Sequence, residues 1–93
     1  MNKYEIMFIV KPNVEDDARN ALIETFKKVL SADNGTIDNV NEWGLRDLAY
    51  EIDDYAKGYY VVVDTTTTPA NIAEFERLSR INANMLRHMT IRK

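Results

Sequence analysis

The sequence predicts an α+β sandwich in which two helices cover one face of a four-stranded antiparallel sheet. Four stretches rich in β-branched and aromatic residues are separated by two stretches whose apolar residues recur every three or four positions. Their order along the chain is strand, helix, strand, strand, helix, strand. The chain has 93 residues, which suits a single domain over 1–93 with one core between two layers.

The first strand is expected over Tyr4–Val10, because this stretch is dominated by β-branched and aromatic residues. Both of its faces are largely apolar, which is typical of a central strand. A helix is then expected over about 14–32, with Asn13 as its N-cap and three acidic residues in its first turn. Asn34-Gly35 predicts a left-handed end to this helix.

The second strand is expected to be long, covering Thr36–Ile52. Its alternation of polar and apolar residues breaks at Trp43-Gly44, which indicates a bulge or bend. Residues 53–58 have the composition of a turn, so the third strand, about 59–67, is expected to return as a hairpin.

The second helix is expected over about 69–83, with Thr68 as N-cap and Pro69 at its first position. The last strand is expected over Met85–Arg92. Strict alternation along this strand would place four side chains on the same face: Met85, Arg87, Met89 and Ile91.

The element order βαββαβ predicts a ferredoxin-like fold. Right-handed crossovers place the first and third strands in the middle, giving the strand order 4-1-3-2 with both helices on one face. The opposite face is left open and carries Met7 and Ile9. An open apolar sheet face on a small protein is expected to bind a partner.

Composition narrows the possible functions. There is no cysteine, which excludes disulfides, cysteine nucleophiles and thiolate metal sites. No apolar run approaches the roughly 20 residues of a membrane span, and no secretory signal is recognisable at Met1–Glu5. We therefore expect a cytoplasmic protein that has no contact with a membrane.

The usual catalytic constellations do not occur in the sequence. His88 is the one histidine and has no matching ligands, and no glycine-rich phosphate loop is found among the three glycines. The third strand begins like an RNA-recognition module, but Val61 and Asp64 occupy the positions where aromatic residues would stack on bases. We expect a protein that is not an enzyme and uses no cofactor, metal or small-molecule substrate.

Charge is distributed unevenly along the chain. Residues 77–93 contain five basic residues and no acid, whereas residues 1–76 contain seven basic and fifteen acidic residues, within a net charge of −3. A basic end on an acidic body suggests one edge that faces a polyanion. The candidate RNA contacts, expected to converge at this edge, are Lys3, Tyr4, Arg80, Arg87, Arg92 and Lys93.

The stretch Glu42–Ile52 closely resembles the second-strand signature of the bacterial small-subunit ribosomal protein S6 family, above all at Leu48-Ala49-Tyr50. Gly58-Tyr59 and Leu86-Arg87-His88 agree with the same family, and the resemblance covers essentially the whole chain. Asp47 departs from it, because the family usually has a basic residue at this position.

The resemblance implies a non-enzymatic ribosomal protein that binds the central domain of small-subunit ribosomal RNA together with a small basic protein, S18. Candidate contacts with this protein partner are Met7, Ile9, Trp43 and Arg46. The residues alone leave another interpretation open, namely a ferredoxin-like domain that senses a small ligand or associates with itself. Binding to RNA that depends strongly on salt would distinguish the first interpretation from the second.

Overall fold

The computed structural model describes residues 1–93 and contains four strands and two helices. Their bounds, in chain order, are β1 (Asn2–Val10), α1 (Asp16–Leu30), β2 (Thr36–Ile52), β3 (Tyr55–Thr67), α2 (Pro69–Ile81) and β4 (Met85–Arg92). All three strand pairings are antiparallel, and the sheet order is β2-β3-β1-β4. The predicted fold class and strand order are therefore confirmed.

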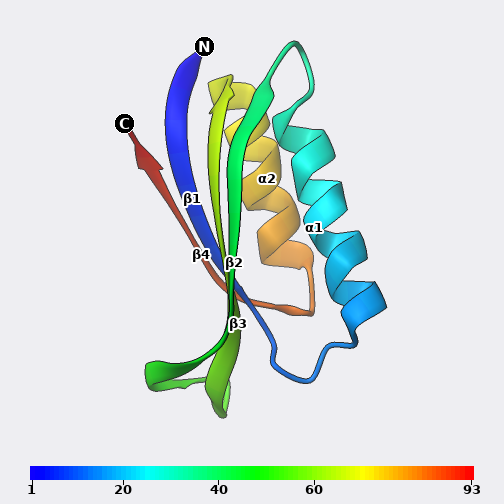
Figure 1. The fold of residues 1–93 in the computed structure, drawn as a ribbon, viewed down its shortest axis with the longest axis vertical. Helices are drawn as coiled ribbons and strands as arrows, with labels where there is room; N and C mark the ends of the chain where they lie inside the picture. Colours follow the sequence, from blue (N-terminus) through cyan, green and yellow to red (C-terminus); the bar gives the residue numbers. More distant parts are fainter.

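The molecule has two layers, with both helices on the same side of the sheet (Figure 1). The other side of the sheet carries no helix, and we call it the open face. The two chain ends lie together at one end of the sheet, where the Lys93 amide donates a hydrogen bond to the Lys3 carbonyl oxygen at 2.9 Å. Neither helix is both long enough and apolar enough to cross a membrane.

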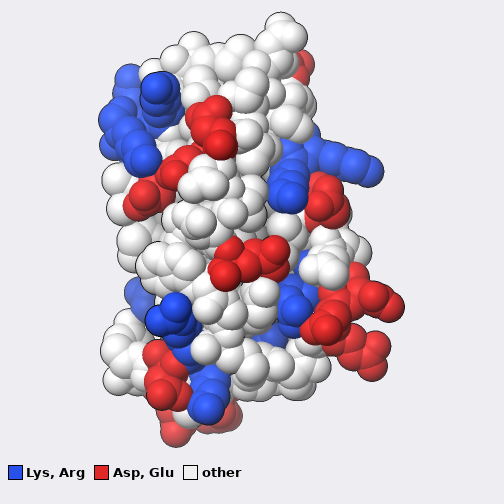
Figure 2. All heavy atoms as spheres, in the orientation of Figure 1, with Lys and Arg blue, Asp and Glu red and all other residues white.

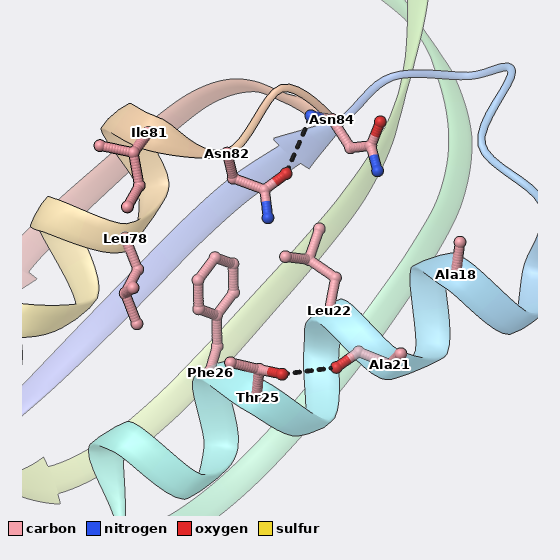
Figure 3. A pocket seen from close by; sticks show the side chains of 9 residues that line it. All are labelled: Ala18, Ala21, Leu22, Thr25, Phe26, Leu78, Ile81, Asn82 and Asn84. Atoms are coloured by element: carbon pink, nitrogen blue, oxygen red, sulfur yellow. Dashed lines mark hydrogen bonds between the residues drawn. The ribbon is translucent and has the colours of Figure 1, made fainter.

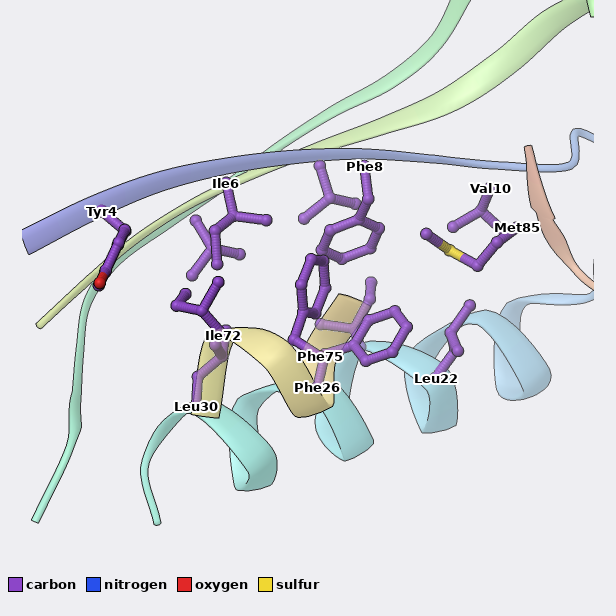
Figure 4. Close-up of a cluster of buried hydrophobic side chains, with 13 residues drawn as sticks. Tyr4, Ile6, Phe8, Val10, Leu22, Phe26, Leu30, Ile72, Phe75 and Met85 are labelled. Atoms are coloured by element: carbon purple, nitrogen blue, oxygen red, sulfur yellow. The ribbon is translucent and has the colours of Figure 1, made fainter. Parts of the chain in front are cut away.

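Three phenylalanines form the centre of the core between the sheet and the helices (Figure 4). Phe8 of β1 meets Phe26 of α1 edge-to-face at a centroid distance of 5.2 Å, and Phe26 meets Phe75 of α2 at 4.9 Å. All three side chains are almost fully buried. Each helix is thus fixed to the sheet by an aromatic residue on its apolar face.

The first helix is shorter than its apolar pattern predicts. It begins at Asp16 with Glu15 in the N-cap position, and the Glu15 side chain makes no capping hydrogen bond. Asn13, the predicted cap, lies in the preceding turn, where the Val14 amide bonds to the Lys11 carbonyl oxygen at 3.4 Å. The second cap is confirmed, since the Thr68 hydroxyl accepts a hydrogen bond from the Asn71 amide at 3.1 Å.

The end of α1 is held against the end of β3 by buried polar groups. The Thr67 hydroxyl donates to the Leu30 carbonyl oxygen at 2.6 Å, and the Asn71 amide group donates to the Ala32 carbonyl oxygen at 2.8 Å. Asn34 has the predicted left-handed backbone, with φ of 68°. Gly35 is required for a different reason, because a Cβ atom there would clash with the Leu30 carbonyl oxygen.

The last strand contains an irregularity that the alternation pattern does not reveal. Val10 pairs with Met85, but its neighbour Ile9 pairs with Arg87, so Leu86 is an extra residue on β4. This bulge places Met85 in the core, whereas Arg87 and the alternate residues after it lie on the open face. The prediction that Met85 shares a face with Arg87 was therefore wrong.

The long hairpin of β2 and β3 bends where the sequence suggests. The register shifts between Glu42 and Gly44, and Gly44 has a φ of 80°, which glycine adopts without strain. The turn is tighter than predicted, because Asp53 and Asp54 both have positive φ and β3 already begins at Tyr55. In Figure 1 the tip of this hairpin curves away from the helices.

Candidate nucleic-acid and partner interfaces

Basic side chains follow β4, the edge strand opposite β2. Lys3, Arg92 and Lys93 lie at the end of the sheet where the two chain termini meet. Figure 2 shows Lys and Arg atoms gathered at this end, with Asp and Glu atoms directly beside them. Each cation is exposed, although Arg92 donates a hydrogen bond to the Asn2 side-chain oxygen at 3.0 Å.

The remaining predicted cations lie further along the same edge. Arg80 is exposed near the end of α2. A short turn joins this helix to the start of β4, and in this turn the Met85 amide donates a hydrogen bond to the Asn82 carbonyl oxygen. The eight residues of β4 span about 25 Å at the usual rise of a strand. We call the five exposed cations the strip: Lys3, Arg80, Arg87, Arg92 and Lys93. They do not form one compact patch, because Arg80 lies at the end of α2, Arg87 lies on the open face and the other three lie at the terminal end of the sheet.

Acidic groups at the terminal end of this strip weaken its positive field. Lys93 Nζ lies 3.0 Å from an Asp64 carboxylate oxygen and 3.9 Å from one of Glu5. The hydrogen bond to Asp64, aided by the nearby acidic charges, raises the pKa of Lys93 above its ordinary value. An anionic ligand must compete with these carboxylates for the ammonium group.

Tyr4 does not belong to this strip. Its ring is only 7% exposed and faces the helices as part of the core, and its hydroxyl group accepts a hydrogen bond from the Asn2 amide group at 3.3 Å. Successive side chains of a strand point to opposite faces, which separates Tyr4 from Lys3. The prediction that Tyr4 stacks on or bonds to RNA is therefore corrected, since the accessible group at this end of β1 is Lys3.

Arg87 lies on the open face and is already engaged. Its Nη1 donates to the Tyr50 hydroxyl at 2.6 Å, and this hydrogen bond raises the pKa of Arg87 above its usual value. A guanidinium group carries five N–H donors. Arg87 can therefore hold Tyr50 and still present donors to a phosphate.

The open face offers an apolar surface with an aromatic pair at its β2 side. Trp43 is 49% exposed and stacks on Tyr60, with ring centroids 6.2 Å apart and planes inclined by 10°. The Arg46 guanidinium lies 5.8 Å from the Trp43 ring centroid, and Arg46 Nε donates to the Trp43 carbonyl oxygen at 3.3 Å. Two of the predicted partner contacts, Trp43 and Arg46, thus form one exposed unit.

The two predicted partner contacts on β1 differ in accessibility. Met7 is half-buried in the middle of the open face, beside Met89 of β4. Ile9 is only 4% exposed, because residues from the end of β2 pass over it. Ile9 therefore supports the surface from below, while Met89, 44% exposed, belongs to the surface although we did not predict it. The alternation that puts Met89 on the same face of β4 as Arg87 is the sequence signal that would have identified it.

A hollow lies between the two helices, and its lining carries few polar groups (Figure 3). It measures about 400 Å³ and is lined mainly by apolar side chains, among them Leu22, Leu78 and Ile81. The Asn82 side-chain oxygen at its rim accepts a hydrogen bond from the Asn84 amide at 2.8 Å, and the Thr25 hydroxyl donates to the Ala21 carbonyl oxygen at 2.9 Å. This arrangement supplies no group for catalysis.

His88 lies on the helix side of β4, and its Nε2 is 3.9 Å from a Glu76 carboxylate oxygen. Its ring packs edge-to-face against Phe75 at a centroid distance of 6.0 Å. No group of three or more His, Cys, Asp or Glu side chains is arranged to hold a metal ion. His88 thus serves as a packing residue between β4 and α2.

Comparison with known proteins agrees with this geometry. Residues 3–92 match the sequence model of ribosomal protein S6. The crystal structure of 30S ribosomal protein S6 from Thermotoga maritima superposes with a TM-score of 0.91 at 35% identity, covering 99% of this chain and 87% of that one.

A crystal structure of an Arabidopsis thaliana protein also superposes, with a TM-score of 0.56 at 13% identity, covering 100% of this chain and 93% of that one. At this identity the likeness concerns the fold alone. The match over residues 3–92 and the 35% identity carry the assignment. The chain belongs to the ribosomal protein S6 family and is a structural, non-enzymatic protein of the small ribosomal subunit.

Proposed function

We propose that this chain binds the central domain of small-subunit ribosomal RNA together with a small basic ribosomal protein of the S18 type. The observation that carries this proposal is the position of two different surfaces on one sheet. A strip of exposed cations follows the edge strand β4, and an exposed apolar surface lies on the adjoining open face. A protein with these two surfaces can contact RNA and a second protein at the same time.

The RNA contacts in this proposal are the accessible cations of the strip: Lys3, Arg80, Arg87, Arg92 and Lys93. Phosphate contacts position a protein on RNA without reading its sequence. A strip of about 25 Å along β4 can follow the phosphates of one strand rather than hold a single anion. Three of these five residues are arginines, whose guanidinium groups can each donate two hydrogen bonds to one phosphate.

The partner contacts in this proposal lie on the open face, around Met7 and the unit formed by Trp43 and Arg46. Aromatic, methionine and arginine side chains are enriched in protein interfaces. Trp43 is held by its stacking on Tyr60, so little conformational freedom is lost when a partner covers it.

Binding is expected to be cooperative. The chain has a net charge of −3, and carboxylates such as Asp64 and Glu5 lie against its terminal cations. Alone it should bind a polyanion weakly. A basic partner seated on the open face would supply positive charge next to the strip and extend the surface in contact with RNA.

The test is a titration of a central-domain RNA fragment with this chain, in the presence and absence of the small basic protein. We expect the affinity for RNA to rise at least tenfold when the partner is present. Equal affinity under both conditions would contradict the proposal. Failure to bind RNA under either condition, together with a stable homodimer in sedimentation, would favour the self-associating domain instead.

A further inference from the structure

Residues Leu48–Ile52, which we call the strap, leave the regular ladder of the hairpin. β2 pairs with β3 as far as Asp47 opposite Lys57, and pairing resumes only at Ile52 opposite Tyr55. The β2 side is therefore longer than the β3 side, and the excess chain must bend out of the ladder. It bends over the open face, where strap side chains enclose a hollow of about 190 Å³.

The strap connects the two opposite edges of the sheet. β2 and β4 are separated by two strands, which corresponds to about 14 Å at the usual strand spacing. Nevertheless the Tyr50 hydroxyl accepts a hydrogen bond from Arg87 Nη1 of β4 at 2.6 Å. This is the one side-chain hydrogen bond that the strap makes. A single polar contact, the hydrogen bond between Arg87 and Tyr50, therefore fixes how far the strap reaches across the sheet.

Apolar contacts set how closely the strap approaches the sheet. A Cβ atom on Gly58 would clash with the Ile9 side chain and would lie 3.6 Å from Leu48. The missing side chain thus leaves room for Ile9, and Leu48 lies within van der Waals distance of the same space. The hollow under the strap is also lined by Met7 and Met89. Where the strap lies therefore decides how much of these two methionines a partner can reach.

We propose that the bond between Tyr50 and Arg87 is a latch, and that Arg87 is a positioning residue for the partner-binding surface as well as a cation of the strip. The latch holds the strap across the open face and so keeps the surface around Met7 and Met89 in one shape before binding. Pre-ordering of this kind removes part of the entropic cost of association. The inference rests on the proposed function, because it assigns the latch to the surface on which the basic partner would sit.

The position of the strap can be measured in the free chain. Tyr50→Phe removes the accepting oxygen but keeps the ring, and Arg87→Lys keeps the charge but its side chain ends one bond short of the Nη1 donor that reaches Tyr50. The matched controls are Tyr55→Phe, at the tip of the same hairpin, and Arg77→Lys, which lies on α2. We expect NMR contacts between the Ala49 methyl group and the methyl groups of Met7 and Met89 to weaken in the first two variants and to persist in both controls.

Affinity for the partner is the second readout, measured calorimetrically with the small basic S18-type protein and without RNA. Tyr50→Phe and Arg87→Lys should each lower the affinity roughly fivefold, which is the effect of one modest hydrogen bond. The double variant should be no worse than either single variant, because both changes break the same bond. The salt dependence of RNA binding should stay unchanged in Tyr50→Phe, since no charge is altered.

Three results would overturn the proposal in different ways. Methyl contacts that persist in both variants would show that the strap does not need the latch. Contacts that are lost while partner affinity is unchanged would remove the role of the latch in binding. If the unsubstituted chain fails to bind the partner, the proposed function fails, and the methyl contacts still decide separately whether the latch positions the strap.

Discussion

Lys93 Nζ lies 3.0 Å from a carboxylate oxygen of Asp64, so the last cation of the chain already has a partner within its own sheet. Asp64 is on β3 and Lys93 follows β4, with Glu5 of β1 between them on the open face. This arrangement restrains a long flexible side chain at the end of the sheet. It also lowers the positive potential that the terminal end of the strip presents to an anion.

Replacing Asp64 should strengthen RNA binding. In Asp64→Asn the ammonium group of Lys93 loses its competing carboxylate, and one negative charge near the strip disappears. An exposed pair of this kind is weak and is screened by salt, so we expect a gain in affinity of no more than roughly fivefold at low salt. Titration of the RNA fragment with partner present measures it. The control is Asp17→Asn, at the start of α1, and an equal gain in both variants would mean that only net charge matters.

The aromatic centre of the core should dominate stability. Phe75 contacts both Phe8 and Phe26 and is fully buried. Phe75→Ala removes the ring and leaves a cavity, at an expected cost of about 3–5 kcal/mol in the free energy of unfolding. Urea denaturation followed by circular dichroism measures this loss. Phe75→Leu should lose less, and a cost below about 1 kcal/mol for the alanine variant would contradict the assigned packing.

The cap of α2 should make a smaller contribution. The Thr68 hydroxyl accepts the Asn71 amide hydrogen, and Asn71 in turn bonds to the end of α1. Thr68→Ala should therefore lower the free energy of unfolding by about 1 kcal/mol. Thr68→Ser keeps the accepting oxygen and should recover most of that loss in the same denaturation experiment. Equal destabilisation by both variants would assign the effect to the lost methyl group instead.

Acid should weaken the fold near the start of β2. Hydrogen bonds from the Thr66 and Thr36 hydroxyls lower the pKa of Asp38 below its ordinary value of 3.8. An acid with a depressed pKa in the folded state stabilises the fold above pH 3.8, and this contribution is lost as the pH falls through the lower folded value. Thermal unfolding between pH 6 and pH 2 should show a shallower acid decline in Asp38→Asn and in Thr66→Val. A decline identical to that of the unsubstituted chain would contradict this origin.

Most of the fold could be predicted because its determinants are local. The apolar alternation of β1, the helical spacing of α1 and α2, and the proline after Thr68 all act within a few residues of one another. The order of elements then left one reasonable topology. The start of α1 was misplaced because Asn13 is a good cap by residue type. In the structure Asn13 lies inside a turn closed by the hydrogen bond from the Val14 amide to the Lys11 carbonyl oxygen, so the helix starts later.

The misassigned site residues have long-range causes. Tyr4 was grouped with Lys3 because they are neighbours in sequence, yet the pleat sends them to opposite faces. The bulge at Leu86 shifted Met85 into the core, and it depends on how β4 meets β1 rather than on β4 alone. The bond from Tyr50 to Arg87 joins residues 37 positions apart, and it depends on the bend of the strap.

The salt dependence of RNA binding in the presence of the small basic partner shows whether the cations of the strip contact phosphate. If four cations of the strip, namely Lys3 of β1, Arg80 of α2, Arg92 of β4 and Lys93 after it, each contact a phosphate, removing them should reduce the log–log salt slope by roughly 3 to 4, at about 0.9 per contact. We therefore predict that a variant with Lys3, Arg80, Arg92 and Lys93 all changed to Gln shows a slope shallower by that amount than the unsubstituted complex. A slope that does not change would contradict the proposed role of the strip, because these four cations would then make no contact with phosphate.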